Sequence, residues 1–205
     1  MNLKSLVVSA IFASAFTSAS ALTVVSGNNP QPDQHNVVHN PCGLPAGSGA
    51  GNPVTGCFAD DNAITVSVSS NEDLDFTAGG QARVEAMDGS LSTLTITLNP
   101  LSTVILNIQT SDDGFVTFSD GAGTSTEFAV DNSGSNFFTV TGITGTFLTF
   151  ETTLLSGGAA ADIVDDVRQI RISQVTAIPE PETYALMMAG LVALGFISRR
   201  RKTKK

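Results

Sequence analysis

Adjacent carboxylates are the side chains in this sequence best able to perform acid–base chemistry. Aspartate pairs occur at 60–61, 112–113 and 165–166, and two positioned carboxyl groups are the machinery of most glycoside hydrolases. Acid-rich turns are much commoner than active sites, and the chain has no GxSxG, P-loop or HExxH motif. We therefore expect no catalytic residues and a non-enzymatic protein. An enzyme with an atypical carboxylate site is the alternative.

Alternating acidic residues offer a second chemistry, which is the binding of a hard cation. In the segment NEDLD, Asn71, Asp73 and Asp75 fall on one face of an extended strand. Calcium takes oxygen ligands of this kind, but Phe76 stands where an EF-hand loop requires glycine. The segment predicts either a structural calcium ion or solvated acidic turns, and we expect no other cofactor.

The two histidines and the two cysteines lie close together in the sequence. His35 and His39 have Asn and Pro neighbours that disfavour a helix, so we expect solvated loop histidines, with metal ligation as the alternative. Cys42 and Cys57 flank a stretch rich in Gly and Pro. In an oxidising compartment this arrangement predicts a disulfide, which contributes about 3 kcal/mol in the chain-entropy model.

The charges of the chain are strongly segregated. The formal net charge is −9, yet residues 22–178 hold seventeen acids, three arginines and no lysine. Such a segment repels phosphate backbones, so nucleic-acid binding is excluded.

The N-terminus has the three parts of a secretory signal peptide. Lys4 supplies a positive start, residues 6–16 are apolar, and Ala19-Ser20-Ala21 is a small-x-small cleavage site. We expect the secretion machinery to export the chain and a signal peptidase to cut it after Ala21, so that residues 1–21 are absent from the mature protein.

The segments between the two ends predict an all-β domain. Residues 22–62 are rich in Gly, Pro and Asn and predict a loop region that contains the disulfide, whereas residues 63–177 alternate apolar and polar positions. About ten short strands separated by Gly, Asn, Asp and Ser turns predict an antiparallel β-sandwich or jelly roll. Nine phenylalanines between residues 58 and 150 are its candidate core.

A secreted jelly roll makes carbohydrate binding a reasonable function. Sugar faces stack well on Trp and Tyr, but the sequence has no Trp and its only Tyr is Tyr184. The sequence therefore permits carbohydrate binding without supporting it.

The C-terminal segment 178–205 predicts a membrane anchor. Residues 184–197 are fourteen uncharged, mostly apolar residues, about 21 Å long as a helix against a hydrocarbon core of about 30 Å. A cationic cluster follows directly and stays on the cytoplasmic side, which holds a precursor in the inner membrane. The cluster begins with Arg199, Arg200, Arg201 and Lys202.

The order of these parts resembles the PEP-CTERM sorting signal. Pro179, Glu180 and Pro181 precede the apolar helix, and the basic cluster ends it. The resemblance implies recognition by exosortase, a membrane cysteine transpeptidase, with cleavage near the Pro-Glu-Pro triplet. It also implies delivery of the product to the cell surface or extracellular matrix of bacteria that produce exopolysaccharide. We therefore expect a non-enzymatic cell-envelope or biofilm-matrix protein, and binding to exopolysaccharide is our second interpretation.

Overall fold

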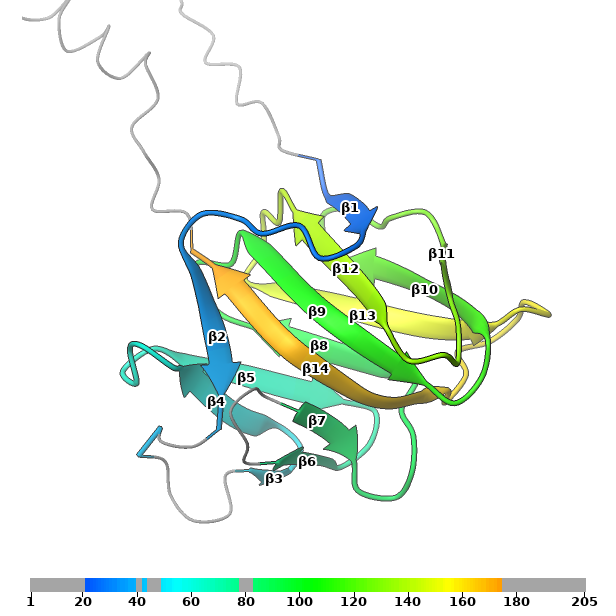
Figure 1. Ribbon diagram of the computed structural model, residues 1–205, viewed down its shortest axis with the longest axis horizontal. Coiled ribbons are helices and arrows are strands. Elements are labelled where there is room, and N and C mark those ends of the chain that lie inside the picture. The colour runs from blue at the N-terminus through cyan, green and yellow to red at the C-terminus, as the bar shows by residue number, and fades with distance from the viewer. Residues whose placement is uncertain (1–20, 40–41, 44–48, 78–82, 175–205) are drawn as a thin grey trace, which may run out of the picture.

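The described part of the protein is built entirely from β-strands, joined by turns and loops. The computed structural model describes residues 21–39, 42–43, 49–77 and 83–174, and no helix occurs in these ranges. The strands, shown in Figure 1, are β1 (Thr23–Ser26), β2 (Gln34–Val38), β3 (Ala50–Gly51), β4 (Val54–Phe58), β5 (Thr65–Ser70), β6 (Leu74–Thr77), β7 (Arg83–Ala86), β8 (Thr93–Thr97), β9 (Thr103–Thr110), β10 (Gly114–Ser119), β11 (Phe128–Val130), β12 (Asn136–Thr141), β13 (Phe147–Leu154) and β14 (Val164–Ser173).

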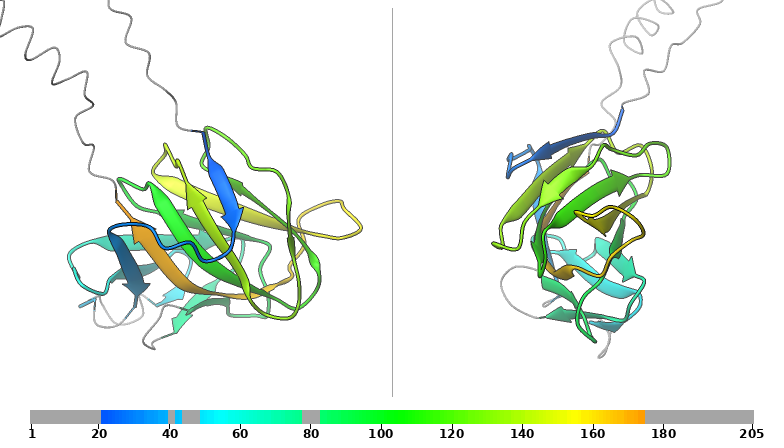
Figure 2. Two further views of the ribbon diagram at one scale, coloured as in Figure 1. Left: turned by 45° about the horizontal axis from the view of Figure 1, so that its top comes forward. Right: turned by 90° about the vertical axis from the view of Figure 1, so that its right-hand side faces the viewer.

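Most strands form where polar and apolar residues alternate. In β8, Leu94 and Ile96 are buried while Thr93, Thr95 and Thr97 lie on the other face, as the two-residue period of a strand requires. The central strand β9 is buried at nearly every position. The connection between β1 and β2 crosses over the layer that contains β9 (Figures 1 and 2).

All pairs of strands are antiparallel and form one continuous sheet that folds over a shared core. Its main path is β1-β12-β9-β14-β2-β4-β5-β8-β13-β10-β11, and β3, β6 and β7 extend it from β14. Strand β2 joins the two layers, since its first residues pair with β14 and Val37 and Val38 pair with β4. Strands that change layer in this way make the corners of folded sheets.

The core is centred on aromatic side chains contributed by both layers. Phe138 of β12 packs against Phe118 of β10 with ring centroids 5.2 Å apart, and Phe150 of β13 lies 6.2 Å from Phe118. Five of the nine expected phenylalanines are fully buried. Phe115, Phe137 and Phe147 are only partly buried, because alternation turns them to the outer faces.

The described ends of the chain lie at the same end of the sheet. Thr23 pairs with Thr141, Thr141 pairs with Thr103, and Thr103 pairs with Ser173. The first residue of β1 and the last residue of β14 therefore stand in one row across four strands. Three strand spacings separate them, which is about 14 Å.

The structure confirms the antiparallel all-β class and the ten strands expected between residues 63 and 175. The β-sandwich or jelly-roll architecture stays a prediction. Residues 22–62, expected as loops, contribute β1 to β4. The predicted disulfide is present, with the Cα atoms of Cys42 and Cys57 5.5 Å apart.

The two predicted membrane-directed segments lie almost wholly outside the described residues. Only Ala21 of the signal peptide is described, and nothing of segment 178–205 is. Within the described ranges, no helix has the length and apolar character to cross a membrane.

Close approach of two strands gives a test of the packing at Gly114. A Cβ atom there would stand 2.3 Å from the Thr153 carbonyl oxygen, so Gly114→Ala must displace backbone. We expect its free energy of unfolding to fall by about 1–3 kcal/mol in urea titrations. At Gly123 the nearest atom would be 3.9 Å away, so Gly123→Ala is the control. Equal stability of the two variants would contradict the strand pairing at Gly114.

Candidate functional site

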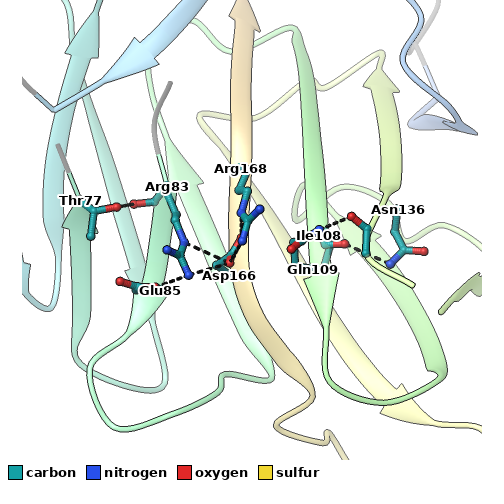
Figure 3. Close-up of polar contacts among 9 residues, drawn as sticks. Thr77, Arg83, Glu85, Ile108, Gln109, Asn136, Asp166 and Arg168 are labelled. Carbon is teal, nitrogen blue, oxygen red and sulfur yellow. Dashed lines mark hydrogen bonds and ion pairs between the residues drawn. The ribbon is translucent and has the colours of Figure 1, made fainter. Parts of the chain in front are cut away.

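A cluster of two arginines and two carboxylates occupies the outer face where β7 meets β14. The register places Glu85 opposite Asp166 and Arg83 opposite Arg168, and Figure 3 shows both guanidinium groups converging on Asp166. Arg168 donates to the two oxygens of Asp166 from Nε at 2.6 Å and Nη2 at 2.7 Å. Arg83 lies 3.1 Å from the same carboxylate and 2.7 Å from Glu85.

Burial separates the roles of these residues. The side chain of Asp166 is 2% exposed, whereas the side chains of Arg83 and Arg168 are 43% and 39% exposed. Hydrogen bonds to Asp166 raise the pKa of Arg168 above its ordinary value, although partial burial opposes the change. The cluster is formally neutral, fixes β7 to β14, and leaves half-exposed guanidinium groups facing solvent.

The aspartate pairs identified in the sequence lie at separate places. Asp60 follows β4 and lies 2.7 Å from His35. Asp113, in the β9–β10 turn, accepts a hydrogen bond from the backbone amide of Asn132 in the β11–β12 connection. In the third pair, Asp165 is exposed while Asp166 belongs to the arginine cluster. The described contacts assign each pair a local partner, so the geometry assembles no facing pair of carboxyl groups from these positions.

The two histidines are held by protein contacts. His35 stacks on Phe58 with centroids 4.6 Å apart and contacts Asp60, while His39 Nδ1 donates to the Thr55 carbonyl at 3.0 Å. Among the described residues, no three His, Cys, Asp or Glu side chains form a group suited to holding a metal ion.

The candidate calcium residues lie at the start of β6, beside other acids. Asn71 is already engaged, since its Oδ1 accepts from the amide and the hydroxyl of Thr93 at 3.3 and 3.0 Å. Repulsion by Asp88, followed by burial and repulsion by Asp162 and Asp73, raises the pKa of Glu72. No arginine or lysine contacts this acidic cluster in the described part of the chain. Calcium binding at Asn71, Asp73 and Asp75 stays a prediction.

Asp120 is a buried carboxylate that was not among the candidate residues predicted from the sequence. It is 3% exposed, and its oxygens accept from the amides of Ala122, Gly123 and Thr144 and from the Thr144 hydroxyl at 2.8 to 3.1 Å. Burial alone would raise the pKa of Asp120, but these hydrogen bonds outweigh it and hold the pKa below its ordinary value. The sequence pattern that indicates this local hydrogen bonding is the Asp-Gly turn at residues 120–121.

The comparisons with known proteins concern the C-terminal end of the chain. Residues 177–202 match the family model of the PEP-CTERM protein-sorting motif. This match confirms the resemblance seen at Pro179, Glu180 and Pro181. No curated protein and no solved structure matches the chain. The motif marks an exported protein that exosortase sorts to the cell surface.

Neutralising Asp166 tests the arginine cluster. Asp166→Asn keeps the shape of the side chain but leaves two guanidinium groups around a neutral amide, so we expect the free energy of unfolding to fall by about 1–3 kcal/mol. Asp165→Asn, at the exposed neighbouring position, should change it by less than about 0.5 kcal/mol. Chemical denaturation measures both, and equal losses would contradict a structural role for the cluster.

The raised pKa of Glu72 predicts that the free energy of unfolding falls as pH rises. Its raised pKa means that the folded state keeps the proton to higher pH than the unfolded state does. Stability therefore falls from the unfolded pKa up to the folded pKa. Glu72→Gln should melt at a higher temperature than wild type at pH 7 and at the same temperature well below the ordinary pKa of glutamate. A difference that does not depend on pH would contradict the repulsion.

Calcium addition tests the predicted cation site separately. Binding to the folded state at 100 times the dissociation constant would add about 2.7 kcal/mol. We expect millimolar calcium to raise the melting temperature above that in chelator or in sodium chloride of equal ionic strength. Asp73→Asn should abolish the increase. A wild-type melting temperature that does not respond leaves only solvated acidic turns.

Proposed function

We propose that this chain is a non-enzymatic cell-envelope or biofilm-matrix protein, delivered by its C-terminal sorting signal. The PEP-CTERM motif at 177–202 is the observation that carries the proposal. The precursor is held in the inner membrane by the apolar helix 184–197 and the basic residues after it. Exosortase then cuts near Pro179-Glu180-Pro181 and passes the β-domain to the surface or matrix.

The position of the chain ends supports this order of events. Strand β14 ends at Ser173, only a few residues before the Pro-Glu-Pro triplet, and stands in the same row as Thr23. One end of the domain therefore faces the anchor, and the loops at the other end face away from the membrane.

Variants of the tail test whether retention and processing are separate. Replacing Pro179 and Pro181 with Ala removes two residues that cannot donate backbone hydrogen bonds, so the helix can extend outward. We expect membrane insertion to persist while precursor accumulates in pulse-chase fractionation. Replacing Arg199, Arg200, Arg201 and Lys202 with Gln should instead weaken retention.

The two tail variants serve as controls for each other. Maturation of the double-Pro variant at the wild-type rate would contradict recognition of the Pro-Glu-Pro region and would remove the main support for the processing step.

A second candidate function, binding of a neutral polysaccharide, is favoured by an uncharged groove. The groove has a volume of about 640 Å³ beside the end of β8, and no charged side chain lines it. Its walls include Thr55, Thr65, Ser67, Thr97, Asn99 and Gln174. Hydroxyl and amide groups both donate and accept hydrogen bonds, which suits a polyhydroxylated partner without requiring Trp or Tyr.

A charged substitution in this groove tests the second function. Ser67→Lys places a flexible cation among the hydroxyl groups, whereas Thr117→Lys makes the same change on β10, outside the groove. In glycan-array and affinity-electrophoresis measurements, we expect wild type and Thr117→Lys to bind neutral polysaccharide. Ser67→Lys should bind at least about tenfold more weakly, a loss of about 1.4 kcal/mol. Absence of binding by wild type would eliminate this function.

A further inference from the structure

A pocket lies where the beginning of β1 meets the connection between β10 and β11. Its volume is about 300 Å³, and its walls include Ala21, Leu22, Asp120, Gly123, Thr124 and Thr144. The pocket therefore combines the last residue of the expected signal peptide, the first residue of the expected mature chain, and the most deeply buried acid outside the arginine cluster.

The carboxylate of Asp120 has no counter-ion among the described residues. Its hydrogen bonds come from backbone amides and one hydroxyl, all of which are neutral. The described cations are Arg83, Arg168 and Arg171, which contact Asp166, Glu85 and Asn28 on another part of the surface. A buried charge held only by neutral groups gains from a cation placed beside it.

Leu22 lines the same pocket as Asp120, and its side chain packs against the hydrophobic core. A Cβ atom on Gly123 would stand 3.9 Å from the Cβ of Leu22 and 4.0 Å from the Oδ1 of Asp120, so Gly123 is the residue that separates the two side chains. The pairing of Thr23 with Thr141 fixes the next residue in the sheet, which holds the backbone of Leu22 at the wall of this pocket.

We propose that the pocket binds the chain's own α-ammonium group, created on Leu22 when the signal peptide is removed. Hydrolysis of the Ala21–Leu22 peptide bond consumes one water and leaves a carboxylate on Ala21 and an ammonium on Leu22. The departing Ala21 vacates its part of the pocket, and the ammonium becomes the counter-ion of Asp120. This inference rests on the export that belongs to the proposed function and on the signal-peptide cleavage after Ala21 expected from the sequence.

The pairing would link processing to the closure of the sheet. Strand β1 is an edge strand of four residues, held by β12 alone, and Asp120 belongs to the connection that leads from β10 to the opposite edge strand, β11. An ammonium donates three hydrogen bonds, and Thr124 and Thr144 offer hydroxyl oxygens in the same pocket. Removal of the signal peptide thus ties one edge of the sheet path to the other.

The absence of lysine between residues 22 and 178 makes the pairing directly measurable. Reductive methylation modifies unprotonated amines. After labelling and digestion, the peptide that begins at Leu22 contains no lysine, so its only labelled amine is the N-terminal one. A nearby carboxylate raises the amine pKa, and each unit of increase slows labelling about tenfold. We expect the folded, exported chain to be labelled at least about tenfold more slowly than the urea-unfolded chain, as measured by mass spectrometry of that peptide.

Two variants separate the ion pair from simple burial. Asp120→Asn should restore fast labelling in the folded protein. Because Asp120→Asn removes a buried hydrogen-bonded charge and can unfold the domain, a second variant inserts Thr between Ala21 and Leu22. This insertion moves the ammonium by one residue, about 3.5 Å, leaves Asp120 in place, and should also restore fast labelling.

Two outcomes would overturn the inference and are distinguishable. Sequencing that finds a mature N-terminus other than Leu22 refutes the expected cleavage and this pairing with it, while the C-terminal sorting proposal is unaffected. A mature chain that begins at Leu22 but is labelled equally fast in wild type, in the insertion variant and in urea refutes the pairing alone.

Discussion

Backbone pairing along both edges of β14 is the interaction on which the rest of the domain depends. One edge pairs with β9 over the length of the strand, while the other pairs first with β7 and then with β2. The change of partner coincides with an irregularity between Arg168 and Arg171, where Gln169 has a φ of 54°. This bulge turns the strand so that β2 can carry the sheet into the second layer.

The arginine cluster and the two-layer core both follow from this placement. Asp166 and Arg168 lie on the outer face of β14 beside β7, so the cluster marks the junction of the β6–β7 hairpin with the main sheet. Val167, Ile170 and Ile172 of the same strand are buried in the core. One strand thus supplies both the apolar contact between the layers and the polar contact that attaches the hairpin.

Local sequence patterns predicted most of the strands between residues 63 and 177. They could not predict which strands pair or which charged side chains meet, because those partners are distant in the sequence. The alternation in TLTIT identified β8, and the order of Pro-Glu-Pro, apolar run and basic cluster identified the sorting signal. Strand β1 escaped prediction because Thr23–Ser26 is only four residues long, is followed by Gly and Asn residues typical of loops, and pairs with β12 more than 110 residues later. The contact of Arg83 with Asp166 spans 83 residues, and no spacing within one segment encodes it.

The central position of β14 also sets the time at which the domain folds. Strand β14 is the last strand in the chain, yet β9, β2 and β7 all pair with it. Until β14 has crossed the membrane, these three strands lack the neighbour that joins them. During export, the polypeptide must therefore stay largely unstructured until Ser173 has crossed the membrane. By that point the apolar segment beginning at residue 184 is only about ten residues behind. With the proposed anchor at residues 184–197, completion of the fold and arrest of the anchor in the membrane would coincide.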